Sequence, residues 1–116
     1  MVWNNTKVLN CYNIGNVSGT KKVGVISGTN GTSSTYPGGT IENCFYKKGD
    51  TPIGLTYGAI KNETFAFEDN AAGIADMLSK LGDAFVADEK DKDGNWIYNN
   101  GYPILKWQKE HNVVNK

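Results

Sequence analysis

An acidic loop, Asp88–Asn95 (D-E-K-D-K-D-G-N), holds the residues best suited to bind a metal ion. Carboxylate and amide oxygens are the ligands that calcium prefers. The candidate ligands are Asp88, Asp91, Asp93 and Asn95. The loop does not fit an EF-hand, because aligning Gly94 with the glycine at position 6 puts Asn100 where a bidentate glutamate is needed. We therefore favour a solvated turn, with calcium as the alternative, and we expect no metal site and no cofactor.

Aromatic side chains could instead supply flat faces for a sugar ring: Trp3, Tyr36, Tyr57, Trp96, Tyr98, Tyr102 and Trp107. Apolar sugar faces stack on exposed aromatic rings, while Asn and Asp supply hydrogen bonds. Strand alternation would put Trp96 and Tyr98 on one face, so these two and Tyr57 are the candidate ligand-binding residues. The favoured alternative is that the rings belong to the core, because large aromatic side chains are mostly buried.

The two cysteines, Cys11 and Cys44, occupy equivalent positions in two similar segments, V-L-N-C-Y (Val8–Tyr12) and I-E-N-C-F (Ile41–Phe45). If the segments stack in register, the two Cα atoms would lie about 4.8 Å apart, which is within the range of a disulfide. Side chains stacked in this way point in the same direction rather than at each other. We therefore expect two stacked, buried free thiols, with a disulfide as the alternative.

Composition argues against several function classes. The formal net charge is zero and all 12 basic residues are lysines; without the arginine fork, nucleic-acid recognition is not expected. No apolar run approaches the roughly 18 residues of a membrane span, and Met1–Asn5 lacks the features of a signal peptide. The chain has no G-x-S-x-G motif, and its one histidine, His111, lies in a polar tail, so we do not expect an enzyme.

The two similar segments that contain the cysteines are predicted to be copies of one structural repeat. The segments start at Val8 and Ile41, 33 residues apart, a spacing typical of stacked repeats. Val8 and Cys11 are three residues apart, so both can face one core only if the chain bends near Asn10, and Asn43 would do the same in the second copy. Asparagines at the same level of successive repeats can form a ladder.

Further strands are predicted at Val23–Gly28, before a loop at Thr29–Gly39, and the second half of the chain changes character. Ile74, Met77, Leu78 and Leu81 have the i, i+3, i+4, i+7 spacing of an amphipathic helix. Asp69 or Asn70 would cap its start and Gly82 would end it. A closing β-hairpin is predicted from a strand at Trp96–Tyr98, a turn at 99–101 and a strand at Tyr102–Trp107.

Two of these motifs resemble a known family. N-C-Y-N-I-G-N-V-S-G (Asn10–Gly19), followed by Val23–Gly28, resembles the GLUG repeat, a glycine-rich β-repeat of bacterial surface and secreted proteins. The helix at Ala72–Leu81 followed by N-G-Y-P-I-L-K-W (Asn100–Trp107) is similar to the segment that often ends such arrays. The resemblance implies a β-solenoid in an extracellular or cell-surface setting, and it carries no catalytic residues.

We therefore expect a mainly β fold, with short β-solenoid-like rungs, one capping α-helix and a closing β-hairpin. Residues 1–63 would hold the repeats, with copies near 8–40 and 41–60, residues 64–108 the cap, and residues 109–116 a flexible tail. In the cap, Tyr102, Pro103 and Trp107 would fill space beside the helix, and Pro103 suits an edge strand.

The expected function is a non-catalytic terminal module that acts as a scaffold, spacer or adhesion module. Its partners would be neighbouring repeats and domains of the parent chain. The alternative is a carbohydrate-binding module that uses exposed aromatic rings, with host or plant glycans as its ligands.

Overall fold

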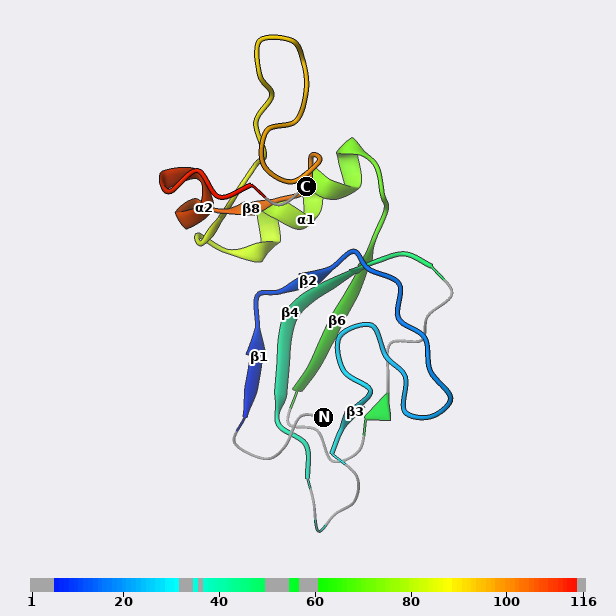
Figure 1. The fold of residues 1–116 in the computed structure, drawn as a ribbon. Coiled ribbons are helices and arrows are strands. Elements are labelled where there is room, and N and C mark those ends of the chain that lie inside the picture. Colours follow the sequence, from blue (N-terminus) through cyan, green and yellow to red (C-terminus); the bar gives the residue numbers. More distant parts are fainter. Residues whose placement is uncertain (1–5, 32–34, 36, 50–54, 57–60, 115–116) are drawn as a thin grey trace. The chain divides into compact units, whose positions relative to one another are not determined.

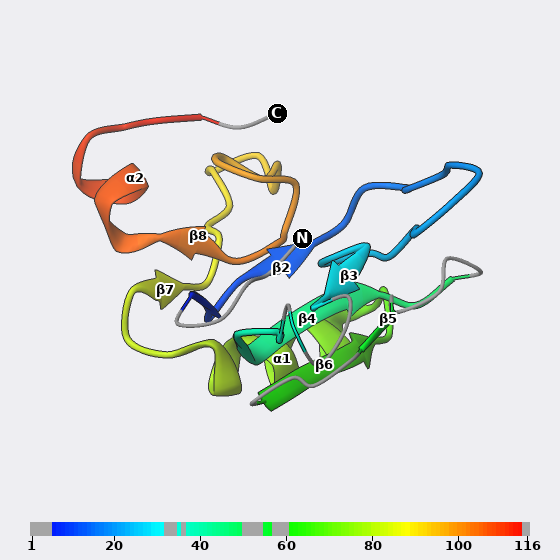
Figure 2. The same ribbon diagram turned by 90° about the horizontal axis from the view of Figure 1, so that it is seen from below.

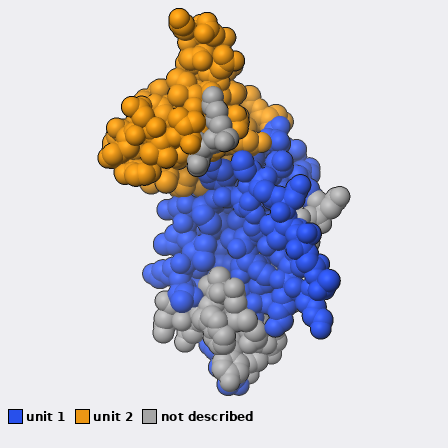
Figure 3. Space-filling view, in the orientation of Figure 1, with its two compact units in different colours: residues 1–69 blue, residues 70–116 orange. Residues whose placement is uncertain are grey.

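The computed structural model describes residues 6–31, 35, 37–49, 55–56 and 61–114 (Figure 1). The chain divides into two compact units, residues 1–69 and residues 70–116 (Figure 3). The described residues are mainly strands with two helices, and these strands do not close into a barrel. Each unit is built around its own local constraint.

A four-stranded parallel sheet is the largest element of the described part of the first unit. Its strands are β1 (Lys7–Leu9), β2 (Tyr12–Asn13), β4 (Thr40–Lys47) and β6 (Lys61–Phe67). β4 is central: β1 and β2 pair with its two halves along one edge, and β6 pairs with the other edge. β4 and β6 run side by side in both views (Figure 1, Figure 2). A second parallel pair joins β3 (Thr29–Asn30) to β5 (Leu55–Thr56).

The two Asn-Cys segments stack in the register that their spacing predicts. Val8 of β1 pairs with Ile41 of β4, and Tyr12 of β2 pairs with Phe45 of β4. The offset of 33 residues is therefore the same before and after the predicted bend. β6 joins with a different offset. Between Ile41 and Cys44 the register against β6 shifts by one residue, because β6 has one residue fewer at this level.

The predicted bend is present in both copies. Asn10 and Asn43 have φ angles of 51° and 54°, the left-handed region that asparagine tolerates better than most side chains. The Nδ2 amide of Asn43 donates to Oδ1 of Asn10 at 2.9 Å, which confirms the asparagine ladder. On β6 the ladder ends, and Glu63 takes its place by accepting the backbone N–H of Asn43 on Oε1 at 3.2 Å.

The core of the first unit follows from this bend. Ile41 and Cys44 are three residues apart, yet their exposed fractions are 1% and 0%. Val8, Cys11 and Ile26 pack against them. A regular strand would have sent one residue of each pair to the opposite face, so the bend is what lets both copies contribute two side chains to one core.

Two parts of the first unit differ from expectation. Val23–Gly28 forms no strand; pairing begins at Thr29, within the predicted loop. Here the Asn13 amide Nδ2 donates to the carbonyl of Val25 at 2.8 Å, so a side chain binds backbone that a ladder would otherwise use. The apolar piece at 64–67, expected to begin the cap, is the end of β6 and lies in the first unit.

The second unit begins with α1 (Ala71–Leu81), and the predicted helix is confirmed together with its cap and its end. Oδ1 of Asn70 accepts the N–H of Gly73 at 2.8 Å, and Gly82 follows the last turn with φ 99°. Met77 and Leu81 are buried. These signals are local to the helix, which explains why the sequence predicts it well.

The predicted hairpin of Trp96–Tyr98 with Tyr102–Trp107 does not form. Instead β7 (Phe85–Val86) pairs antiparallel with β8 (Ile104–Leu105), and Trp96 makes one isolated bridge with Lys90. A second helix, α2 (Lys106–Glu110), follows β8 and enters the segment expected to be a flexible tail. Oε1 of Gln108 accepts the N–H of Leu105 at 3.0 Å, which turns the chain from strand to helix.

Replacing Asn43 tests the constraint of the first unit. We expect Asn43→Ala to lower the free energy of unfolding by about 1–2 kcal/mol, because alanine resists a positive φ and the ladder bond is lost. Asn43→Gly is the control: it also removes the bond but accepts the φ angle, so it should be less destabilising. Urea unfolding of the three chains measures both effects, and equal losses for alanine and glycine would contradict a role for the backbone angle.

Candidate functional site

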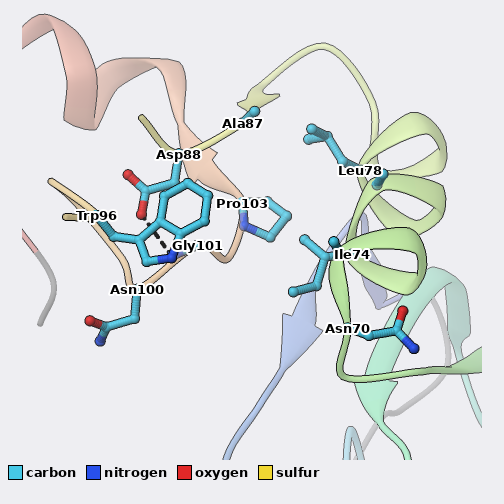
Figure 4. Close-up of a pocket in the computed structure, with 11 residues that line it drawn as sticks. Asn70, Ile74, Leu78, Ala87, Asp88, Trp96, Asn100, Gly101 and Pro103 are labelled. Atoms are coloured by element: carbon cyan, nitrogen blue, oxygen red, sulfur yellow. Dashed lines mark hydrogen bonds between the residues drawn. The ribbon is translucent and has the colours of Figure 1, made fainter. Parts of the chain in front are cut away.

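A pocket of about 370 Å³ lies within the second unit, between α1 and the loop that leads to β8 (Figure 4). Its apolar wall comes from α1, where Ile74 and Leu78 are one turn apart and face Pro103 across the opening. Met77 and Leu81, on the same predicted stripe, are buried instead. The stripe is therefore wider than the core requires, and its outer half lines the pocket. Its polar lining residues are Asn70, Asp88 and Asn100.

Asp88 organises the loop beside this pocket. Its Oδ1 accepts the N–H groups of Glu89 at 2.8 Å and Tyr98 at 3.0 Å. Its Oδ2 accepts those of Asn99 at 2.8 Å and Gly101 at 2.9 Å, the latter drawn in Figure 4. Burial raises the pKa of Asp88, but the four backbone donors together outweigh it and hold the pKa below its ordinary value.

Asp88 also explains why the predicted hairpin is absent. The backbone N–H groups of Tyr98, Asn99 and Gly101 are bound to one carboxylate, so they do not form a ladder with a neighbouring strand. The sequence marks Asp88 as a candidate calcium ligand, whereas the structure uses both of its oxygens to fold the loop. An aspartate before a segment rich in Asn and Gly was the available signal for such a role.

Asp91 serves a separate turn. Its Oδ1 accepts the N–H groups of Asp93 at 2.8 Å and Asn95 at 2.9 Å. Asp88 and Asp91 thus bind different stretches of backbone. Within the described ranges, no group of three or more His, Cys, Asp or Glu side chains is arranged to hold a metal ion.

Trp96 is the aromatic residue at the pocket. Its side chain is 38% exposed, and its ring lies against Gly101, where an added Cβ would meet Cε2 of the indole at 2.9 Å. The ammonium group of Lys90 lies 4.6 Å from the ring centroid, a cation–π contact. Lys90 therefore shares the ring surface that a stacked ligand would use.

Among the described residues, Tyr98 does not join Trp96 to form a platform. Tyr98 is 7% exposed, so the expected platform of Trp96 and Tyr98 is absent; the backbone curls around Asp88 here and strand alternation does not apply. Tyr57 lies outside the described residues. Of the three predicted cap residues, Pro103 is buried and Tyr102 is partly buried. Trp107 is 54% exposed rather than filling internal space, and its ring stacks on His111 at 5.1 Å.

In the first unit, Cys11 and Cys44 form a close pair of thiols. Their Sγ atoms are 3.1 Å apart and the cysteines are not bridged, as the stacked-thiol interpretation predicts, but Cys11 is only partly buried, whereas both thiols were expected to be buried. Hydrogen bonding from Cys11 lowers the pKa of Cys44 to about 7, although burial and the Glu63 carboxylate oppose this. The same bond, together with burial, raises the pKa of Cys11.

Neither of the described helices is long and apolar enough to cross a membrane. Comparison of the chain with family models, with curated proteins and with solved structures finds no match. The two candidate functional sites are therefore defined by their geometry alone: the asparagine–cysteine ladder (Asn10, Cys11, Asn43 and Cys44) and the Trp96 pocket.

Asp88→Asn tests the organisation of the loop. The variant keeps one acceptor oxygen but places an NH₂ group against two backbone donors, so we expect it to lower the free energy of unfolding at pH 7 by about 1–3 kcal/mol. The pKa of Asp88 is below its ordinary value of 3.8. Its contribution is therefore full above that pH and is lost as the pH falls through the folded pKa.

The stability difference between wild type and Asp88→Asn should thus shrink as the pH falls below 3.8 and through the lowered pKa of Asp88 in the folded chain. Urea unfolding at several pH values, followed by tryptophan fluorescence, measures this difference. Asp83→Asn is the matched control, because it changes an exposed carboxylate of the same unit. If Asp88→Asn were as stable as wild type at pH 7, the carboxylate would not be organising the loop.

Proposed function

We propose that this chain is a non-catalytic terminal module of a β-repeat array, in which the strands of the first unit are rungs of a short β-solenoid. Its role would be that of a scaffold, spacer or adhesion module in a bacterial cell-surface or secreted protein. The observation that carries this proposal is the pairing of two like segments at a constant offset of 33 residues on both sides of their bend. Stacked repeats require this relation, since each unit covers the face of the next.

The side chains of the ladder support the same proposal. Asn10 lies against Asn43 and Cys11 against Cys44, each at hydrogen-bond distance. Like residues at one level of successive rungs can satisfy each other indefinitely along a stack. Within the described residues, β1 and β2 pair with β4 alone, and the other edge of such strands is a surface on which a preceding repeat could pair.

A terminal position explains why the pattern stops at β6. Glu63 replaces the ladder asparagine at this level, and one residue is missing from the register. β6 leads into charged residues that pair with the end of β4: Lys48 with Glu68 at 2.8 Å, and Lys47 with Asp69 at 3.8 Å. These exposed pairs add little stability. They make the segment polar where the chain leaves the stacked strands. The resemblance to the segment that ends GLUG arrays agrees with this position.

Duplication of the repeat tests the proposal. Inserting a second copy of residues 8–40 after residue 40 keeps the 33-residue offset, so a stack should lengthen by about 4.8 Å and gain one more interface. Small-angle scattering measures the length and thermal unfolding the stability, and we expect both to increase. The control insert carries alanine in place of its copies of Asn10 and Cys11, and it should gain less stability. An insert that lowers the melting temperature without lengthening the particle would contradict a stack.

Glycan binding at the Trp96 pocket is a second candidate function. The specific observation in its favour is that Trp96, which is 38% exposed, lines the same pocket as Asn70 and Asn100. A sugar would have to stack on the part of the ring that Lys90 leaves open or displace the ammonium group. The apolar wall of Ile74 and Leu78 would then cover a hydrophobic face of the ligand.

Tryptophan fluorescence, scanned against a panel of host and plant glycans, tests this second candidate. Binding in the pocket should change the emission saturably, and Trp96→Ala should weaken it about tenfold, because ring stacking contributes about 1–1.5 kcal/mol. Trp107→Ala is the matched control, since Trp107 does not line the pocket and should leave the affinity unchanged. Saturable binding that survives Trp96→Ala, or a panel in which no glycan changes the emission, would count against this site.

A further inference from the structure

The thiol pair has a property that a purely structural ladder does not need. The Sγ atoms of Cys11 and Cys44 are 3.1 Å apart, so an approach of about 1 Å would bring them to the length of a disulfide bond. Cys11 lies between β1 and β2, Cys44 lies on β4, and the pairing of β1 and β2 with β4 holds the two residues in register on both sides of the pair. Little chain movement is therefore required for the sulfur atoms to meet.

The two sulfurs also differ in accessibility. Cys11 is partly exposed, whereas Cys44 has an exposed fraction of 0%. A reagent from solvent can thus reach Cys11, and Cys44 can be reached from Cys11. This is the arrangement of an attacking thiol with an internal resolving thiol.

We propose that Cys11 and Cys44 form a redox-responsive modification site, at which a low-molecular-weight disulfide converts the two thiols into an intramolecular disulfide that locks the first two stacked strands together. The proposal does not depend on the array function, because it requires only the two strands and their sulfurs.

The reaction balances as two thiol–disulfide exchanges. The pair first loses the Cys44 proton to solvent, the Cys11 proton then passes to Cys44 along their hydrogen bond, and the Cys11 thiolate attacks one sulfur of the oxidant R–S–S–R. The S–S bond of the oxidant breaks, a mixed disulfide forms on Cys11, and R–S⁻ leaves and takes up a proton. Cys44 then loses its proton to solvent, and its thiolate attacks Sγ of Cys11 and expels the second R–S⁻, which takes up a proton. In total, two protein thiols are oxidised to one disulfide and one oxidant disulfide is reduced to two thiols.

The hydrogen bond between the sulfurs favours the first ionisation of the pair. The S–H of Cys11 donates to Sγ of Cys44 at 3.1 Å and stabilises a thiolate there, and the same bond lets the remaining proton pass between the two sulfurs. This sharing brings the first ionisation of the pair close to neutral pH, as the pKa of about 7 for Cys44 indicates. Thiolate is the reactive form in exchange, so the pair should react faster than an isolated buried cysteine.

Locking would follow from the length of chain that the bond encloses. Cys11 and Cys44 are 33 residues apart, and a disulfide across a loop of this size restricts the unfolded chain strongly. We expect the oxidised protein to melt on the order of 10 °C higher than the reduced protein. The reduced chain would remain free to separate the two strands at lower temperature.

The test treats the reduced chain with oxidised glutathione at mildly alkaline pH and follows it by intact mass, with dithiothreitol added afterwards. We expect the mass to fall by two hydrogen atoms, peptide mapping to join Cys11 to Cys44, dithiothreitol to restore both thiols, and the melting temperature to rise on oxidation. Chains that end as stable glutathione adducts or as intermolecular dimers would overturn the proposal. A crosslinked chain that melts no higher than the reduced one would overturn the locking role.

Single variants separate the two sulfurs. Cys44→Ser should accumulate one glutathione on Cys11, because the resolving thiol is gone, while Cys11→Ser should remain unmodified because its remaining sulfur is buried. Cys44→Ala gives the same readout without placing a hydroxyl in the core. Circular dichroism checks that each variant is folded. Equal rates of glutathione addition to Cys11→Ser and Cys44→Ser, both folded, would contradict the assigned roles.

Discussion

The left-handed bend at Asn10 and Asn43 is the constraint on which the first unit depends. At φ angles of 51° and 54° it reverses the side-chain alternation of two strands at the same level. Residues three apart can then face one core, which is why Ile41 and Cys44 are buried together. Because the same bend occurs in both copies, their register is preserved across it, and the amides and the thiols stack. The close sulfur pair is thus a geometric consequence of two asparagines.

The second unit depends on a comparable device. Asp88 binds four backbone N–H groups, from Glu89, Tyr98, Asn99 and Gly101, and so folds a long connection without a strand ladder. In both units a polar side chain satisfies backbone groups that regular pairing would otherwise take. This leaves Trp96 against Gly101 at the edge of the pocket and turns Tyr98 into the interior.

The two candidate functions use different units of the chain. The array proposal depends on the ladder in residues 1–69, while glycan binding would use a pocket built from residues 70–116. One exposed indole with Lys90 above it offers less stacking surface than two coplanar rings would. The repeated register is the more specific observation, because a constant offset through a bend is difficult to explain except by stacking like segments.

The features that local chemistry controls can be predicted from the order of the amino acids. The register of the Asn-Cys segments, the bends at Asn10 and Asn43, and the helix from its Asn70 cap to Gly82 could all be predicted, since each depends on residue types at short or repeated spacing. Three features emerge only in the folded chain: β8 pairs with β7, residues 64–67 extend the first sheet, and Asp88 binds backbone up to 13 residues away. These outcomes depend on which residues far apart in the sequence come into contact. Hydrophobic periodicity and secondary-structure propensity carry no information about such contacts.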